Sequence, residues 1–126
     1  MANTIYNTQS GTDGVEFYDA DIDGALVPVV RTVAGTTYTA IKTDRTIVST
    51  NATSAAVTIP ANIYPVGTKI DLIQGGAGAL TVVAGAGVTI TVNATYALGA
   101  AARYSQFSIF QRDTNVWVAY GDLALV

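Results

Sequence analysis

The sequence predicts an all-β protein, built as a single antiparallel β-sandwich or jelly-roll-like body with an extended N-terminal arm. Along most of the chain after residue 36, apolar residues alternate with Thr and other polar residues, which is the period of a strand with one buried face. Clusters of Gly, Asn, Asp and Pro separate these runs. Only 97–103 invites a helix assignment, but it is short and contains Gly99, so we expect a connection there.

Four strands are expected in the first half of the body, at residues 37–43, 46–50, 55–59 and 68–74. Asp44 and Arg45 provide a turn between the first two strands. Pro60 ends the third strand, because proline cannot donate a backbone hydrogen bond to a neighbouring strand. In the fourth, Lys69 and Asp71 alternate with apolar residues, which predicts one wet and one dry face in a meander strand.

Hairpins are expected in the second half. Residues 76–82 and 85–92 each lead from a Gly-rich turn into a β-branched strand, and two hairpin units are the simplest interpretation. A phosphate-binding loop is the disfavoured alternative, because the required glycine spacing and following lysine are missing. Residues 104–112 and 116–120 flank Asp-Thr-Asn at 113–115, which predicts a three-residue hairpin loop with a residue near the left-handed region.

Trp117 is expected in the core of this last hairpin. Alternation places Trp117 and Ala119 on one face of the strand. The other face then carries Val116, Val118 and Tyr120. Because both faces are largely apolar, we expect one to pack in the core and the other against a neighbouring subunit. A sugar-binding platform of exposed rings is the competing interpretation of the aromatic residues gathered here.

Residues 1–36 differ from the body, which we place at residues 37–126. Large apolar residues are sparse before Leu26, five of the nine acidic residues lie in this segment, and glycines interrupt each candidate element. Two apolar patches, at residues 15–18 and 26–30, are unusual for a disordered tail. We therefore expect an arm that becomes ordered on a partner.

Three acidic residues, Asp19, Asp21 and Asp23, precede Gly24 with the spacing that opens a calcium-binding loop. The position at which such a loop supplies its bidentate carboxylate is Val30, however, and neither flank has a helical pattern. We therefore favour a solvated or partner-facing acidic turn over a calcium site, and expect no metal or other cofactor.

Composition argues against several classes of function. The 126 residues include no His and no Cys, which removes the side chains on which most acid–base, thiol and transition-metal chemistry depends, so we expect no enzyme. The net charge is −3 and the six Lys and Arg residues are scattered, so we expect no nucleic acid partner. No apolar run approaches the roughly 20 residues of a membrane span, and no signal peptide is recognisable, so we expect neither membrane insertion nor export.

A series of strand and turn sequences follows in a fixed order between residues 46 and 122. Its members are Val-Thr-Ile-Pro-Ala-Asn at 57–62, Tyr-Pro-Val-Gly-Thr-Lys-Ile at 64–70, Gln-Gly-Gly-Ala-Gly-Ala-Leu-Thr-Val at 74–82, Gly-Val-Thr-Ile at 87–90, and Asn-Val-Trp-Val-Ala-Tyr-Gly-Asp at 115–122. In this order the chain resembles β-domains of structural proteins of tailed bacteriophages, namely capsid decoration (cement) proteins, head fibres and some tail fibres.

The resemblance implies a structural virion protein, made in the host cytoplasm, that decorates and cements the capsid exterior by binding the lattice of the major capsid protein. It also implies assembly as a homotrimer. We expect the arm to contact the capsid through its apolar residues, Ile5, Tyr6, Val15, Phe17, Tyr18 and Leu26. The alternative is a tail or head fibre module that binds host-surface glycans. A free-standing carbohydrate-binding module is disfavoured, because no signal peptide or linker is recognisable.

Overall fold

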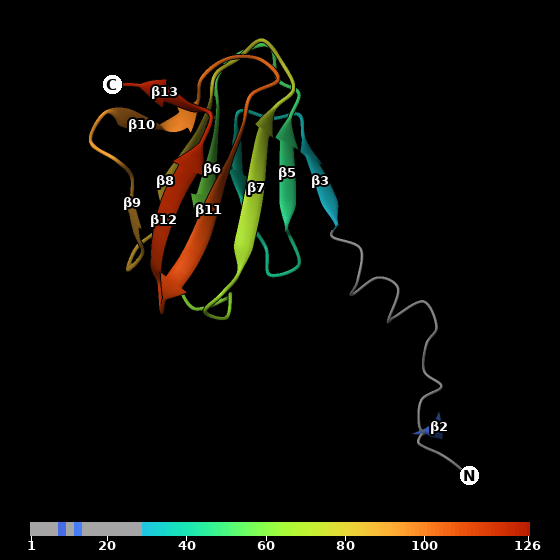
Figure 1. Cartoon of the computed structure of the whole chain (residues 1–126). Coiled ribbons are helices and arrows are strands. Elements are labelled where there is room, and N and C mark those ends of the chain that lie inside the picture. The colour runs from blue at the N-terminus through green and yellow to red at the C-terminus, as the bar shows by residue number, and fades with distance from the viewer. Residues whose placement is uncertain (1–7, 10–11, 14–28) are drawn as a thin grey trace.

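The computed structural model describes residues 8–9, 12–13 and 29–126, and within them all regular secondary structure is β-strand. Near the N-terminus, β1 (Thr8–Gln9) and β2 (Thr12–Asp13) form a small antiparallel pair. The other strands form a six-stranded and a five-stranded sheet that lie one behind the other in Figure 1. The prediction of an all-β fold is confirmed, and the two sheets are arranged as in a β-sandwich.

Each sheet combines strands from both halves of the chain. The six-stranded sheet contains, in spatial order, β3 (Val30–Val33), β5 (Thr46–Ser49), β7 (Lys69–Gln74), β11 (Gln106–Asp113), β12 (Val116–Gly121) and β9 (Thr89–Thr91). The five-stranded sheet contains β13 (Leu123–Leu125), β10 (Tyr96–Ala100), β8 (Leu80–Ala84), β6 (Ala55–Ile59) and β4 (Thr37–Thr39). Both sheets are mixed, because they contain parallel as well as antiparallel neighbours.

From β3 to β8 the chain passes back and forth between the two sheets. β3, β5 and β7 lie in the six-stranded sheet, whereas β4, β6 and β8 lie in the five-stranded sheet. Because each strand is followed by one in the opposite sheet, successive strands of one sheet run in the same direction and pair in parallel. The prediction of an antiparallel body is therefore wrong for this half of the chain, and β7 is not a meander strand.

The Gly-rich turns at residues 75–78 and 85–87 connect strands of opposite sheets, so the prediction of two hairpins across residues 76–92 is wrong. Close packing explains the glycines of the first turn. A Cβ atom added to Gly78 would lie only 1.7 Å from the backbone carbonyl oxygen of Thr53. The turn between β7 and β8 thus lies directly against the turn between β5 and β6, where a side chain would collide.

The second half of the chain adds mostly antiparallel strands. β11 and β12 form the expected hairpin, and the predicted left-handed residue is Asn115, with a φ of 57°. The loop contains two residues, Thr114 and Asn115, and not the predicted three, because Asp113 is part of β11 and pairs with Val116. β11 also pairs antiparallel with β7, which joins the hairpin to the parallel strands. Residues 96–100 form β10, although the sequence predicts an irregular connection from residue 97. β10 pairs with β8 and β13, and these distant strands supply a pairing that its Ala- and Gly-containing sequence does not predict.

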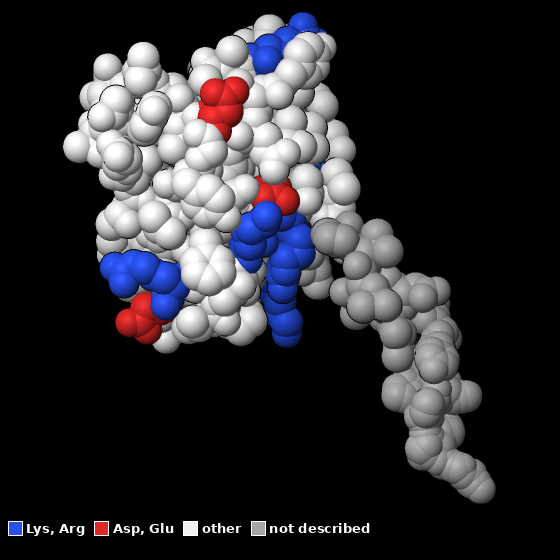
Figure 2. All heavy atoms as spheres, viewed as in Figure 1, with Lys and Arg blue, Asp and Glu red and all other residues white. Residues whose placement is uncertain are grey.

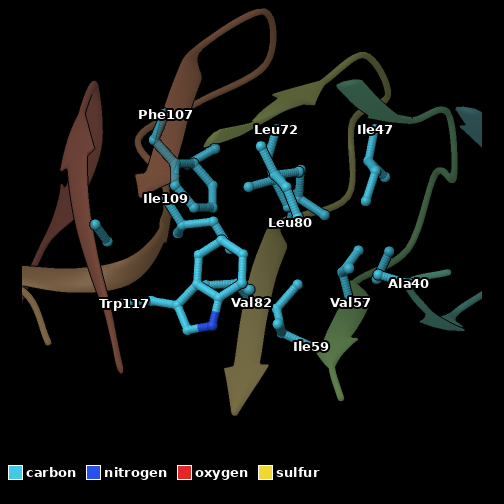
Figure 3. Packing of buried hydrophobic residues seen from close by; sticks show 14 of the residues in the cluster. Ala40, Ile47, Val57, Ile59, Leu72, Leu80, Val82, Phe107, Ile109 and Trp117 are labelled. Atoms are coloured by element: carbon cyan, nitrogen blue, oxygen red, sulfur yellow. The ribbon is translucent and has the colours of Figure 1, made fainter. Parts of the chain in front are cut away.

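The side chains between the two sheets form one apolar core. Trp117 and Phe107, both from the hairpin, are its largest fully buried side chains, and Trp117 is only 1% exposed. Figure 3 shows Trp117 among side chains from both sheets, including Ile109 of β11 and Val82 of β8. The prediction that Trp117 is a core residue is therefore confirmed.

Gln111 fastens the hairpin to the segment that precedes β7. Its buried side-chain amide donates hydrogen bonds to the backbone carbonyl oxygens of Tyr64 (2.9 Å) and Pro65 (2.7 Å). Its side-chain oxygen accepts a hydrogen bond from the backbone N–H of Asn115 (2.9 Å) at the hairpin tip. Because each polar atom of this buried amide has a partner, the side chain holds the loop and the hairpin in one fixed arrangement.

The six-stranded sheet includes part of the segment predicted to be the arm. β3 covers residues 30–33 and pairs in parallel with β5, although the boundary of the body is predicted at residue 37. Val33 of β3 is buried against the core. Of the apolar patch predicted at residues 26–30, Val30 thus begins an edge strand of the body, and residues 26–28 lie outside the described residues.

Candidate interaction surface

Two rows of side chains cross β7, β11 and β12 on the outer face of the six-stranded sheet. In each row, a residue of β11 lies between its register partners on β7 and β12. We define the Phe110 face as the six residues of these two rows, Lys69, Phe110 and Val118, and Asp71, Ser108 and Tyr120. The residues come from distant parts of the chain, and the register of β11 against both neighbours brings them together.

The apolar side chains of the Phe110 face are open to solvent. Tyr120 is 45% exposed and Phe110 is 36% exposed, and Val118 lies half-buried beside Phe110. Figure 2, drawn from the same side as Figure 1, shows a mostly uncharged surface on which charged side chains gather in a few small groups. Neighbouring exposed aromatic and apolar side chains are typical of surfaces that bind a partner.

The polar residues of the Phe110 face form one connected group. The Ser108 hydroxyl donates a hydrogen bond of 2.5 Å to Oδ1 of Asp71, and Nζ of Lys69 lies 3.6 Å from the same oxygen. The Asp71 side chain is 25% exposed and that of Lys69 is 53% exposed. Ser108 and Lys69 therefore hold the carboxylate in place, and Lys69, the register partner of Phe110, adds an exposed positive charge to the face.

This arrangement is suited to binding a protein surface. Phe110 and Tyr120 provide aromatic anchors, which contribute strongly to protein interfaces because they bury a large area and have few rotatable bonds. Lys69 offers a positive charge for a carboxylate of the partner, and the hydrogen bond from Ser108 to Asp71 is already formed. A partner that covers the face therefore meets an Asp71 carboxylate whose Oδ1 already has a donor.

A further exposed aromatic residue, Tyr104, lies in the loop between β10 and β11. Its side chain is 72% exposed, and the guanidinium of Arg103 lies over its ring, 4.9 Å from the centroid. The φ of Tyr104 is 70°, a conformation that residues with bulky side chains rarely adopt. The hydrogen bond of 2.6 Å from its backbone N–H to the carbonyl oxygen of Gln74 holds this conformation. An exposed ring kept in a costly conformation is a second candidate for contact with a partner.

Asp44 is fully buried and stabilises the fold. Its carboxylate accepts hydrogen bonds from Nε of Arg31 (3.0 Å), the hydroxyl of Tyr38 (2.6 Å) and the backbone N–H of Ile41 (3.0 Å). Burial, together with the hydrogen bond to Asp44, raises the pKa of Tyr38 to about 12. The hydrogen bond to Asp44 also raises the pKa of Arg31 above its ordinary value. The carboxylate thus connects β3, β4 and the turn that follows β4.

Some of the predicted contact residues lie outside the residues that the structure describes. These are the six arm residues, Ile5, Tyr6, Val15, Phe17, Tyr18 and Leu26, and the three acidic residues weighed for calcium, Asp19, Asp21 and Asp23. Within the described ranges, no three His, Cys, Asp or Glu side chains lie close enough together to hold a metal ion. Residues 8–9, 12–13 and 29–126 also contain no helix long and apolar enough to cross a membrane.

Part of the Phe110 face could be predicted from the sequence. Alternation along β12 places Val118 and Tyr120 on the outer side, and the burial pattern of β12 confirms this. The link between Ser108 and Asp71 is not predicted, because it depends on the register of two strands that are far apart in the sequence. In the sequence, only the alternation of polar and apolar residues in β7 bears on this link. It predicts which side of β7 faces solvent, but not which strand lies beside β7.

No protein-family model, no curated protein and no solved structure matches the chain. The assignment of a function therefore rests on the described surface and on the sequence itself.

Proposed function

We propose that the protein is a structural virion protein that decorates and cements the exterior of a bacteriophage capsid, where it binds the major capsid protein as a homotrimer. The observation that carries the proposal is the Phe110 face, a fixed sheet surface with exposed aromatic anchors beside the hydrogen-bonded pair of Ser108 and Asp71. The resemblance of residues 46–122 to decoration proteins supports the same role.

The Phe110 face supplies the contact between the body and a subunit of the shell. Phe110 and Tyr120 become buried against the capsid protein, and Lys69 pairs with one of its carboxylates. The arm residues that the sequence predicts as capsid contacts add a second attachment. Two linked attachments hold far more tightly than either alone, because the second binds at a high effective concentration once the first has formed.

A protein that reinforces a shell must also keep its own shape under load. Two buried polar side chains provide this rigidity here, because Asp44 and Gln111 each make three hydrogen bonds that connect separate segments of the chain. Opening either segment would leave buried polar atoms without partners, which costs about 1–3 kcal/mol for each group. The turns of the body therefore resist local opening.

The number of copies per particle tests the proposed role. Quantitative mass spectrometry of purified phage particles should find hundreds of copies of the protein per particle, because a decoration protein occupies sites that repeat across the capsid lattice. A handful of copies would support a fibre instead, and absence from the particles would contradict a virion role altogether.

Variants of the full chain test the surface. We expect Phe110→Asp and Tyr120→Asp to weaken co-sedimentation with undecorated shells at least tenfold, because each places a charge in the contact. Val66→Asp is the matched control, since Val66 is an exposed apolar residue in a loop outside both sheets. Equal binding by all three variants would show that the Phe110 face does not bind the shell.

Binding of host-surface glycans by a head or tail fibre is the second candidate function. The exposed rings of Tyr104 and Tyr120 favour it, because sugars stack on open aromatic faces. An array of glycans probed with the full chain separates the two functions. A saturable signal that Tyr104→Ala or Tyr120→Ala abolishes would favour the fibre, and no signal is expected of a decoration protein.

A further inference from the structure

The five-stranded sheet contains no charged residue. None of β4, β6, β8, β10 and β13 includes an Asp, Glu, Lys or Arg. The six-stranded sheet differs, since it carries Arg31, Lys69, Asp71, Arg112 and Asp113. The strands of the two sheets therefore differ in their charge. The Phe110 face lies on the six-stranded sheet, so it does not explain why the five-stranded sheet lacks charged residues.

The outer face of the five-stranded sheet is built from small side chains in two straight rows. Parallel pairing in register places residues of β4, β6 and β8 side by side. We define the threonine face as these six residues, Thr37, Ala56 and Thr81 in one row, and Thr39, Thr58 and Val83 in the other. Neighbouring strands of a sheet lie about 4.8 Å apart, so the rows form a close and even surface.

The threonine face is accessible to a partner. Val83 is 43% exposed, and Thr37, Thr39 and Thr81 are also exposed. A sheet whose outer side chains are short can approach another such sheet at the usual spacing of about 10 Å without large rearrangement. The hydroxyl groups can exchange hydrogen bonds with each other across the contact, as each is both a donor and an acceptor.

The lack of charge on the threonine face indicates which kind of partner covers it. In a symmetric contact between identical copies, a charged side chain near the symmetry axis meets the same charge on the other copy and is repelled. A face without charges removes this repulsion between identical molecules, whereas a partner with a charged surface would lose hydration there and gain no ion pair. The same face can meet its own copies around a symmetry axis, which is how most homo-oligomers assemble.

We propose that the threonine face is the contact surface between copies of this chain. This inference rests on the self-association included in the proposed function, but not on binding to a capsid. It assigns the two outer sides of the body to different partners. The threonine face binds further copies, and the Phe110 face on the opposite sheet remains free for another protein.

Sedimentation velocity of the full chain over a range of concentrations tests the inference. Wild-type protein should form a defined oligomer, and Thr81→Lys and Val83→Lys should each weaken association at least tenfold by placing like charges in the contact. Thr32→Lys is the matched control, because Thr32 is an exposed threonine of β3 in the other sheet, and this variant should associate as the wild type does. Thermal melts of each variant show whether it remains folded.

Mixing two variants of opposite charge provides a second test of the contact. Thr81→Glu should also dissociate the oligomer, and mixing it with Thr81→Lys should restore association, because opposite charges then meet in the contact. A wild-type protein that is monomeric at every concentration would overturn the inference, as would an oligomer that survives both lysine variants. An oligomer of two copies would support this contact while contradicting the proposed homotrimer. Capsid binding by a monomeric variant would leave the proposed decoration role intact.

Discussion

The rings of Tyr64 and Trp117 meet edge to face, with their centroids 5.6 Å apart and their planes at 88° to each other. Tyr64 precedes β7, and Trp117 lies in β12, so the contact joins two distant segments. The Tyr64 hydroxyl also donates a hydrogen bond to the carbonyl oxygen of Ile41, in the turn that follows β4. A continuous series of contacts therefore runs from the C-terminal hairpin, through Tyr64, to the first strands of the body.

Replacement of Trp117 by Ala should lower the free energy of unfolding by about 3–5 kcal/mol, because it empties a large buried site and removes the partner of Tyr64. Urea denaturation measures this loss. The control is Val118→Ala in the same strand, where the half-buried side chain faces outward and a loss of about 1 kcal/mol is expected. A loss within about 0.5 kcal/mol for Trp117→Ala would show that the indole is not a core group.

Introducing a methyl group at Gly78 should destabilise the fold. The added Cβ atom would lie 1.7 Å from the carbonyl oxygen of Thr53, so one of the two turns must move, at a cost of about 2–3 kcal/mol. Gly35→Ala is the matched control, because its nearest neighbour would lie at 3.8 Å, an ordinary contact distance. Equal melting temperatures for the two variants would contradict the close approach of these turns.

The protein should lose stability as the pH rises above 10. Burial raises the pKa of Tyr38 from 10.0 to about 12, so between these values the unfolded chain releases this proton while the folded protein keeps it. The stabilisation is complete below pH 10 and is lost as the pH rises toward 12. Burial also raises the pKa of Tyr64, which adds to the effect with the same sign.

Thermal melts from neutral pH to about pH 11.5 measure this loss. Tyr38→Phe should give a shallower decline with pH, because one of the two phenols with a raised pKa is removed. Tyr104→Phe serves as the control, since the Tyr104 side chain is largely exposed, and it should decline as the wild type does. A wild-type melting temperature that stays constant across this range would contradict the raised pKa of both phenols.

Ser49→Ala should leave the stability unchanged or raise it by up to about 1 kcal/mol. The Ser49 hydroxyl is buried in β5 and has no hydrogen-bond partner among the described residues, so its removal relieves an unsatisfied group. Ser108→Ala is the contrasting variant, because this hydroxyl donates to Asp71, and its loss should cost about 1 kcal/mol. Chemical denaturation of both variants distinguishes a satisfied from an unsatisfied hydroxyl. A clear loss of stability in Ser49→Ala would reveal a partner for this group.

The features predicted correctly from the sequence are those that depend on neighbouring residues. The hairpin around Asn115 and the buried side of β12 follow from a short loop and from alternation, and both are local. Parallel pairing is not local, because β6 is joined to β8 through a strand of the other sheet. The same limit applies to the interaction surface. Alternation predicts the apolar outer side of β12, but the position of Asp71 beside Ser108 requires the register between β7 and β11.

The passage of successive strands between opposite sheets also determines how the chain can fold. Ala55 pairs with Leu80 and Val30 with Thr46, so each parallel pair forms only after an intervening strand has crossed to the other sheet and returned. Such loop closures are costly in entropy, and folds dominated by distant contacts reach the native state in milliseconds to seconds, whereas helical bundles need only microseconds to milliseconds. The hairpin of β11 and β12 closes over a short loop, so it can form early and offer β7 an edge on which the remaining strands assemble.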